Sequence, residues 1–245
     1  MNIAIILAGG TGTRIGGDLP KQFIKIMNKP ILAYTLELFQ GCDNIHAIEI
    51  VCHKDWVEEV RKIVEEYAIT KTKWLAIGGA TFQESVMNGV FHLRGKVDPE
   101  DIAVVSFGVS PMTPVEDIND GIRVCRERGN AIAAKDIDLC TCIKDDENST
   151  TQNLIRETIK GFGNPWTFRI GELCDAYEQA QERGILNKLE PHTTSLYFAL
   201  GKRLWFSQST AISAKITTRG DLDLFEGYLL LQEKRRHKME HEVLP

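Results

Sequence analysis

The feature that most constrains the fold is an alternation of short β-branched runs with segments of helical periodicity through the first half of the chain. The runs expected to form strands are Asn2–Leu7, Ala47–Cys52, Lys73–Ile77, Ile102–Phe107 and Ala131–Ala134. Between them, apolar residues recur at helical spacing in Ile31–Phe39, Trp56–Tyr67, Gln83–Leu93 and Pro114–Arg128. The alternation predicts an α/β fold, with a Rossmann-like, mostly parallel sheet and helices on both faces. Right-handed crossovers would bring the carboxyl ends of the strands to one edge, where ligands bind.

The pattern changes from Asp138 to Glu157. Two strand-like pieces, Leu139–Lys144 and Thr151–Glu157, flank a polar stretch at 145–150. This arrangement predicts a protruding β-hairpin arm at about 138–157. The elements expected beyond it are a helix at Gly171–Arg183, a strand at Leu204–Ser207 and a last helix from near Asp221, whose side chain can satisfy free N–H groups there. Without a repeat or linker, we expect a single domain over residues 1–245.

The charge and the cysteines exclude several classes of function. A net charge of −5 and a pI near 5.7 provide no basic field for a nucleic-acid backbone. The apolar N-terminus lacks the basic start of a signal peptide, and no apolar run reaches the roughly 20 residues that cross a bilayer. We therefore expect a cytoplasmic protein with no nucleic-acid or membrane partner. The six cysteines form no C-x-x-C pair, so we expect buried thiols rather than a zinc site or disulfides.

The strongest chemical signal is a glycine-rich loop directly after the first expected strand. It reads Ala8-Gly9-Gly10-Thr11-Gly12-Thr13-Arg14-Ile15-Gly16 and is followed by Pro20-Lys21-Gln22. Glycines adopt backbone angles that let successive N–H groups surround a triphosphate, and Arg14 and Lys21 would add positive charge against its β- and γ-phosphates. Such charge stabilises a pyrophosphate leaving group. The loop lacks the ending of a Walker P-loop and the third glycine of a dinucleotide fingerprint. The alternative is a tight turn with surface charges, but this combination of glycines and basic residues favours a phosphate-binding loop.

Together with three further segments, the loop resembles the 2-C-methyl-D-erythritol 4-phosphate cytidylyltransferase family and its ribitol-5-phosphate relatives. The segments are 28–36 (NKPILAYTL), 78–86 (GGATFQESV) and 215–222 (KITTRGDL). The resemblance implies an isoprenoid-biosynthesis-like nucleotidyltransferase that transfers CMP from CTP to a polyol phosphate, with release of pyrophosphate. It also implies Mg²⁺ as the divalent metal and a homodimer that exchanges the hairpin arm.

The resemblance assigns residues to roles. It implies that Arg14, Lys21 and Lys215 are catalytic and that Arg156 binds the polyol phosphate. The residues matching the nucleotide site are Ala8, Gly9, Gly10, Thr11, Gly12, Gly78 and Ser85. The alternatives are an exposed strand residue for Arg156 and surface charge for Lys215.

Several positions depart from the family. The metal-binding aspartate falls on Phe107 and the arginine after it on Ser110, while the arginine of the base segment falls on Phe82. A phenyl ring cannot coordinate a hard cation, so the metal ligands are unknown, and Asp136 or Asp138 is a hypothesis. In the arm, Thr141-Cys142 stands in place of the family's Asp-Thr pair, and Gly163-Asn164-Pro165-Trp166 stands in place of its Gln-Thr-Pro-Gln segment. The family's acidic pair near His192-Thr193 is absent.

Three functions remain open on this basis. The first is an active cytidylyltransferase whose Mg²⁺ is held largely by substrate phosphates. The second is a catalytically weakened, nucleotide-binding paralogue with a regulatory or scaffolding role, which Phe107 favours. The third is a nucleotidyltransferase with another base or sugar preference, which Phe82 favours.

Overall fold

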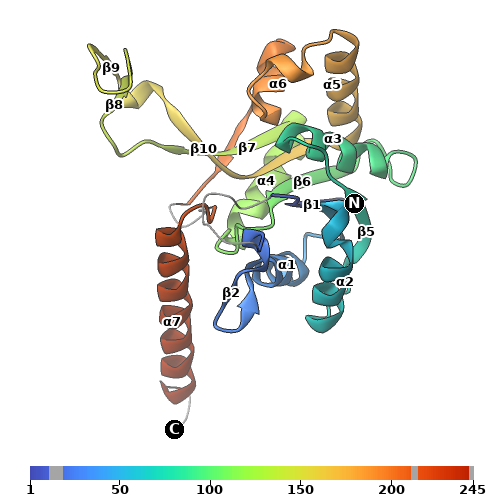
Figure 1. Ribbon diagram of the computed structural model, residues 1–245, viewed down its shortest axis with the longest axis vertical. Coiled ribbons are helices and arrows are strands. Elements are labelled where there is room, and N and C mark those ends of the chain that lie inside the picture. The colour runs from blue at the N-terminus through green and yellow to red at the C-terminus, as the bar shows by residue number, and fades with distance from the viewer. Residues whose placement is uncertain (11–18, 211–214, 243–245) are drawn as a thin grey trace.

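The computed structural model describes residues 1–10, 19–210 and 215–242. Its strands are β1 (Asn2–Ala8), β2 (Lys25–Ile26), β3 (Lys29–Pro30), β4 (Ala47–Cys52), β5 (Thr72–Ile77), β6 (Ile102–Phe107), β7 (Asn130–Asp136), β8 (Thr141–Ile143), β9 (Gln152–Leu154), β10 (Lys160–Arg169) and β11 (Phe206–Gln208). The described residues form a seven-stranded sheet in the order β11-β7-β10-β6-β1-β4-β5 (Figure 1).

The sheet is mixed but mostly parallel, as predicted. Strands β6, β1, β4 and β5 run parallel to one another, and β11 runs parallel to β7. Strand β10, which the sequence did not predict, lies antiparallel between β6 and β7. It contains Gly161, Gly163 and Pro165, and its register shifts between Phe162 and Trp166. Glycine and proline within a strand typically mark such irregularities, and they hid this strand from the pattern analysis.

Helices cover both faces of the sheet (Figure 1), which confirms the predicted layering. The helices of one face are α1 (Ile31–Gly41), α2 (Val57–Glu66) and α4 (Val115–Arg128). Those of the other face are α3 (Phe82–Leu93), α5 (Ile170–Glu182) and α6 (Thr193–Ala199). Strand β1 contributes to the core on both faces of the sheet, because alternate side chains of a strand point to opposite faces. Ala4 and Ile6 pack on the α1 face, whereas Ile3 and Ile5 pack on the α3 face.

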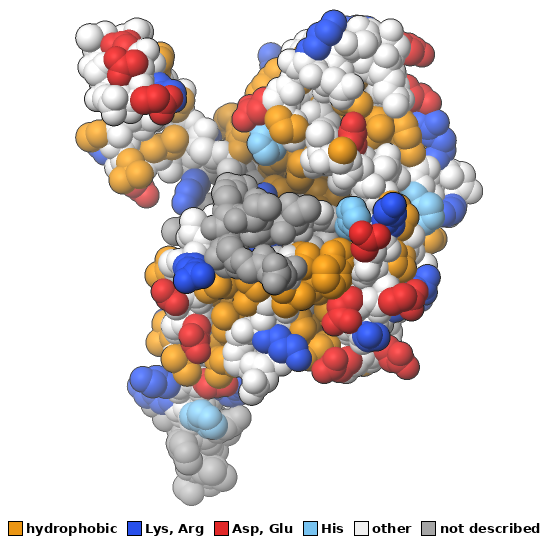
Figure 2. All heavy atoms as spheres, viewed as in Figure 1, with side chains coloured by type: hydrophobic (Ala, Val, Ile, Leu, Met, Phe, Trp, Pro, Cys, Tyr) orange, Lys and Arg blue, Asp and Glu red, His pale blue; other side chains and the backbone are white. Residues whose placement is uncertain are grey.

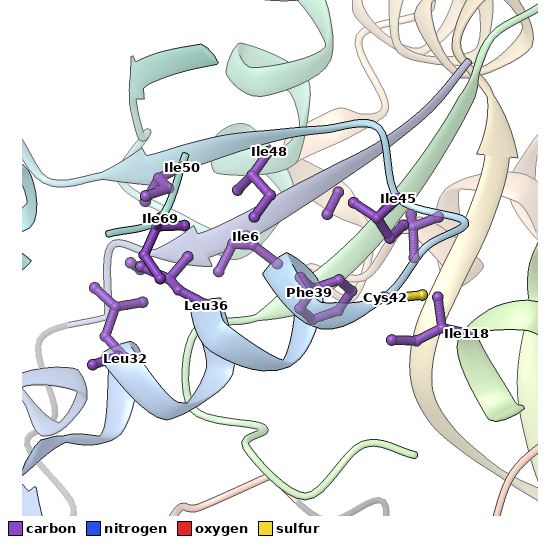
Figure 3. Close-up of a cluster of buried hydrophobic side chains, with 14 of the residues drawn as sticks. Ile6, Leu32, Leu36, Phe39, Cys42, Ile45, Ile48, Ile50, Ile69 and Ile118 are labelled. Carbon is purple, nitrogen blue, oxygen red and sulfur yellow. The ribbon is translucent and has the colours of Figure 1, made fainter. Parts of the chain in front are cut away.

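The core on the α1 face fixes the position of the strand ends that build the site. Figure 3 shows Leu32, Leu36 and Phe39 of α1 directed at the sheet, where Ile6 and Ile48 lie. All five side chains are fully buried. Burial of one such side chain stabilises the fold by about 1.5–3 kcal/mol, so this face is a rigid support for β1 and β4.

A buried carboxyl group lies between the sheet and helix α3. Glu49 of β4 is fully buried, and one of its oxygens lies 2.7 Å from Nδ1 of His92 on α3. Burial raises the pKa of Glu49 to about 8. Burial, and then the nearby Lys96, lower the pKa of His92. At neutral pH the proton between these two groups therefore belongs mainly to the carboxyl group.

The predicted hairpin is confirmed. Strands β8 and β9 pair antiparallel and project away from the sheet at the upper left of Figure 1. The arm exposes three large apolar side chains, Leu139, Ile143 and Ile155. The expectation of buried cysteines is wrong for two arm residues, Cys140 and Cys142, which are exposed because a thin two-stranded arm has no interior. The other cysteines, at 42, 52, 125 and 174, are buried.

The last helix, α7 (Arg219–Glu242), begins slightly before the predicted position. Asp221 accepts hydrogen bonds from the N–H groups of Thr217 and Thr218, at 2.7 and 2.8 Å, and its own N–H donates to the Thr218 hydroxyl. This confirms the prediction that the Asp221 side chain satisfies N–H groups at the helix start, and the Thr218 hydroxyl satisfies the Asp221 N–H in return. Although burial acts to raise the pKa of Asp221, the hydrogen bonds from Thr217 and Thr218 outweigh it and lower the pKa.

Four short 3₁₀ segments complete the described elements: η1 (Lys21–Phe23), η2 (Lys54–Trp56), η3 (Arg156–Thr158) and η4 (Leu186–Lys188). Within the described ranges, no helix is both long enough and apolar enough to cross a bilayer.

Candidate active site

A cavity of about 280 Å³ lies at the carboxyl edge of the sheet, where the segments after β1, β5 and β6 meet. Its described lining comprises Leu7, Gly9, Gly10, Lys21, Gln22, Gly79, Ala80, Thr81, Phe82, Ser85, Phe107, Val109, Lys215 and Thr217. This is the edge at which ligands bind in open α/β sheets. We call it the nucleotide cavity, after the role that the sequence analysis predicts for the residues that line it.

Two lysines predicted from the sequence converge on this cavity. Gln22 is buried and donates from Nε2 to the Ala8 carbonyl at 2.7 Å, which ties η1 to the end of β1. Next to it, Lys21 donates from Nζ to the Ile216 carbonyl at 3.2 Å. The segment that carries Lys215 is held in turn by the Ile216 N–H, which donates to the Val109 carbonyl at 2.9 Å. Hydrogen bonds therefore connect segments nearly 200 residues apart and place both lysines on one cavity.

The opposite wall is the turn between β5 and α3. The Gly78 N–H donates to the Cys52 carbonyl at 2.9 Å, and a Cβ at Gly79 would lie 2.3 Å from Cβ of Glu84, so only glycine fits there. Helix α3 begins with a capping box, in which the Thr81 hydroxyl accepts from the Glu84 N–H and the Glu84 carboxylate accepts from the Thr81 N–H. These bonds hold the turn against the cavity.

Ser85, which the resemblance assigns to the nucleotide site, lies on the first turn of α3 and lines this cavity. Its hydroxyl donates to the Thr81 carbonyl at 2.9 Å and accepts from the Gly79 N–H at 3.1 Å. Ser85 therefore shapes the turn as well as facing the cavity.

The other predicted residues fall in three groups. Gly9 and Gly10 line the nucleotide cavity, whereas Ala8 and Gly78 are next to lining residues without lining it themselves. Thr11, Gly12 and Arg14 lie outside the described residues. Arg156 lies on η3 of the arm, lines neither this cavity nor the one described next, and forms an ion pair with Glu157.

A second cavity, of about 490 Å³, shares Phe107 and Lys215 with the first. We call it the adjacent cavity. Its remaining lining is Phe162, Gly163, Asn164, Trp166, Glu190, His192, Thr194, Ser195 and Phe198. The sequence analysis assigned none of these residues to a site. The departure at Gly163-Asn164-Pro165-Trp166 was the available signal, because it places an aromatic residue where the family has a polar segment.

Aromatic rings from separate segments form the wall between the two cavities. The centroids of Phe82 and Phe107 are 5.2 Å apart, and Trp166 lies 5.5 and 6.0 Å from these two rings. His192 packs against Phe82 and Trp166 at 5.5 and 5.9 Å. The Lys215 ammonium lies 3.7 Å from the Phe107 centroid, within the range of a cation–π interaction. We call Phe82, Phe107, Trp166 and His192 the aromatic wall.

The described residues do not fit a metal ion held by the protein. None of those that line the nucleotide cavity carries a carboxylate, and no group of three potential ligands from His, Cys, Asp and Glu occurs in the described part of the chain. Asp136 and Asp138 line neither cavity, and Asp136 forms an ion pair with Lys160 at 2.7 Å. The hypothesis that these aspartates hold Mg²⁺ is therefore not supported by their positions.

Comparison with known proteins identifies relatives over nearly the whole chain. The family model of 2-C-methyl-D-erythritol 4-phosphate cytidylyltransferase matches residues 2–230. A ribitol-5-phosphate cytidylyltransferase of Lacticaseibacillus paracasei is 34% identical over 233 residues, which cover 95% of this chain and 100% of the relative. A 2-C-methyl-D-erythritol 4-phosphate cytidylyltransferase of Petrotoga mobilis is 30% identical, with 91% and 96% of the two chains covered.

Solved structures share the fold. The 4-diphosphocytidyl-2C-methyl-D-erythritol synthase of Anaerococcus prevotii superposes with a TM-score of 0.78 at 21% identity, covering 93% of this chain and 95% of that one. The 2-C-methyl-D-erythritol 4-phosphate cytidylyltransferase of Thermus thermophilus gives 0.74 at 19% identity, covering 93% and 98%.

Proposed function

The chain belongs to the 2-C-methyl-D-erythritol 4-phosphate cytidylyltransferase family, and we propose that its acceptor is ribitol 5-phosphate. It is a cytidylyltransferase that transfers CMP from CTP to a polyol phosphate with release of pyrophosphate. The observation that carries the choice of acceptor is the 34% identity to a ribitol-5-phosphate cytidylyltransferase along the whole of that relative. The adjacent cavity is consistent with a polyol acceptor in general, because Thr194 and Ser195 contribute hydroxyl-bearing side chains to its lining.

In the proposed reaction, CTP occupies the nucleotide cavity and ribitol 5-phosphate the adjacent cavity. An oxygen of the acceptor phosphate attacks the α-phosphorus of CTP. The bond from that phosphorus to the oxygen bridging to the β-phosphate breaks, and pyrophosphate leaves with the bond electrons. No proton transfer is needed, because the attacking phosphate oxygen is already ionised.

The two lysines have distinct roles in this proposal. Lys21, beside Gly10, stabilises charge on the departing pyrophosphate. Lys215 lies on the boundary of both cavities and can approach the acceptor phosphate as well as the α-phosphate. It would hold the two anionic groups together, which offsets their mutual repulsion. Mg²⁺ is part of the proposal as a companion of CTP, bound by the triphosphate and by water.

We also propose a homodimer through the arm and a cytoplasmic location, where CTP is available. The exposed Leu139, Ile143 and Ile155 support the dimer, because an isolated two-stranded hairpin with apolar side chains in water is marginal. Figure 2 shows hydrophobic side chains on the projecting arm. In such a dimer, the partner's arm would bring its copy of Arg156 toward an adjacent cavity.

The test is a pyrophosphate-release assay with each nucleoside triphosphate and a panel of acceptors. The panel contains ribitol 5-phosphate, 2-C-methyl-D-erythritol 4-phosphate, glycerol 3-phosphate and ribose 5-phosphate, with Mg²⁺ present. We expect the highest kcat/KM for CTP with ribitol 5-phosphate. A higher value for another polyol phosphate would overturn the acceptor, and a higher value for another nucleotide would favour the third function considered above.

A further inference from the structure

We infer that Phe107 is a positioning residue for CMP transfer, because its ring holds the Lys215 ammonium at the boundary between the nucleotide and adjacent cavities. The inference rests on the proposed function for the reaction it assists. Phe107 replaces the carboxylate that the family resemblance predicts at this position, and its ring and Lys215 are the features that the two cavities share.

The geometry of the contact is fixed from both sides. Phe107 ends β6 and is paired in register with Leu7 of β1, so its backbone belongs to the central sheet. Its ring packs on Phe82 at an interplanar angle of 38° and edge-on against Trp166 at 76°. Three aromatic rings that contact one another leave little freedom for rotation of the Phe107 side chain.

The lysine side of the contact is equally constrained. Ile216, which follows Lys215, is fully buried and donates its N–H to the Val109 carbonyl, two residues beyond Phe107. Thr217 and Thr218 are held by Asp221 at the start of α7. The strand that carries Phe107 and the backbone directly after Lys215 are therefore anchored, which keeps the ammonium within reach of the ring, 3.7 Å from its centroid.

A ring and a carboxylate would place Lys215 with different electrostatic consequences. A carboxylate would neutralise the ammonium and would also repel substrate phosphates unless a metal ion lay between them. The ring attracts the ammonium through its quadrupole and carries no net charge. The ring thus helps to hold Lys215 at the boundary of the two cavities without adding a negative charge beside the ammonium. Because Phe82 replaces a second charged residue of the family and packs on Phe107, the two departures form one aromatic unit.

The expected effect follows from the strength of the contact. The strength of a cation–π pair corresponds to roughly a two- to thirtyfold factor, so loss of the ring face should lower kcat roughly tenfold. Phe107→Leu keeps an apolar side chain and removes the ring. Phe107→Tyr keeps the ring face and should lose less activity than Phe107→Leu. The affinity for CTP, measured by calorimetry, should change much less than kcat.

The test combines a double-mutant cycle with a spectroscopic readout that does not need activity. If Phe107 acts through Lys215, Phe107→Leu should have little further effect on kcat in a Lys215→Ala background. With lysines dimethylated by ¹³C-formaldehyde, the Lys215 signal, assigned through Lys215→Arg, should be shifted upfield by the ring and should return toward the other lysines in Phe107→Leu. Phe206→Leu is the matched control, because Phe206 also contacts a lysine, Lys160, but lines neither cavity.

The outcomes separate this inference from the proposed function. Multiplicative effects of the two substitutions, or an unshifted Lys215 signal in the wild type, would overturn the positioning role. A shifted signal that Phe107→Leu removes, in a protein that releases no pyrophosphate with any acceptor, would refute the proposed function and leave the placement of Lys215 established.

Discussion

Substitution of Lys21 by alanine should weaken CTP binding by one to two orders of magnitude. Lys21 lies in the described lining of the nucleotide cavity, next to Gly10, and its ammonium reaches the Ile216 carbonyl on the far side. A hydrogen bond to a charged group contributes about 1.5–3 kcal/mol. At about 1.4 kcal/mol per decade, loss of one such contact to a phosphate raises Kd roughly 10- to 100-fold.

Isothermal titration calorimetry of CTP, in the presence of Mg²⁺, measures this effect. Lys25→Ala is the matched control, because it removes the same charge from an exposed residue of β2 that lines neither cavity. Since exposed charges are screened by salt and partly buried pairs much less, the difference between the two variants should persist when the ionic strength is raised. Equal CTP affinities for the wild type and a folded Lys21→Ala protein would refute the assignment of the nucleotide cavity.

Three further predictions test other parts of the account. If the chain forms the proposed dimer, replacement of Leu139, Ile143 and Ile155 together by serine should give a monomer by light scattering, and a monomeric wild type at micromolar concentration would contradict the proposed role of the arm. Without nucleotide, Mg²⁺ should produce no measurable heat of binding, whereas a tight site in the nucleotide-free protein would show protein ligands after all. In the unfolded chain Glu49 loses its proton near pH 4.5 and His92 near pH 6.5, whereas the folded state keeps the Glu49 proton up to about pH 8. Between pH 6.5 and about 8 the folded state therefore binds more protons than the unfolded state, so the free energy of unfolding should fall as pH rises through this window. The slope should be at most about 1.4 kcal/mol per pH unit, and urea titrations of Glu49→Gln, which cannot lose that proton, should show none of it.

The buried parallel strands were predictable because their residues face helices on both sides and are mostly apolar, apart from Glu49 in β4 and Ser106 in β6. Ala47–Cys52 and Ile102–Phe107 have the same bounds in the sequence analysis and in the structure. Strand β10 was missed because its glycines and proline suggest a loop. Helix α6 was missed because its 7 residues are too short for a clear period.

The candidate site likewise contains residues that could be predicted from the sequence and residues that could not. Lys21 could be found because it lies within a local motif beside the strand that positions it. The aromatic wall could not, because its members come from β6, β10 and the starts of α3 and α6. Phe82 and Phe107 were visible only as departures from the family. Their contact with each other, and that of Phe107 with Lys215, depends on the packing of these segments.

The central claim is that this chain joins CMP to a polyol phosphate, and ³¹P NMR of the reaction mixture tests it most directly. With CTP, ribitol 5-phosphate and Mg²⁺, we expect the monoester signal of the acceptor to be replaced by the two coupled signals of a CDP-linked product, with an equal amount of pyrophosphate. Unchanged spectra from a folded protein that binds CTP, with ribitol 5-phosphate and with every other polyol phosphate tried, would contradict the account.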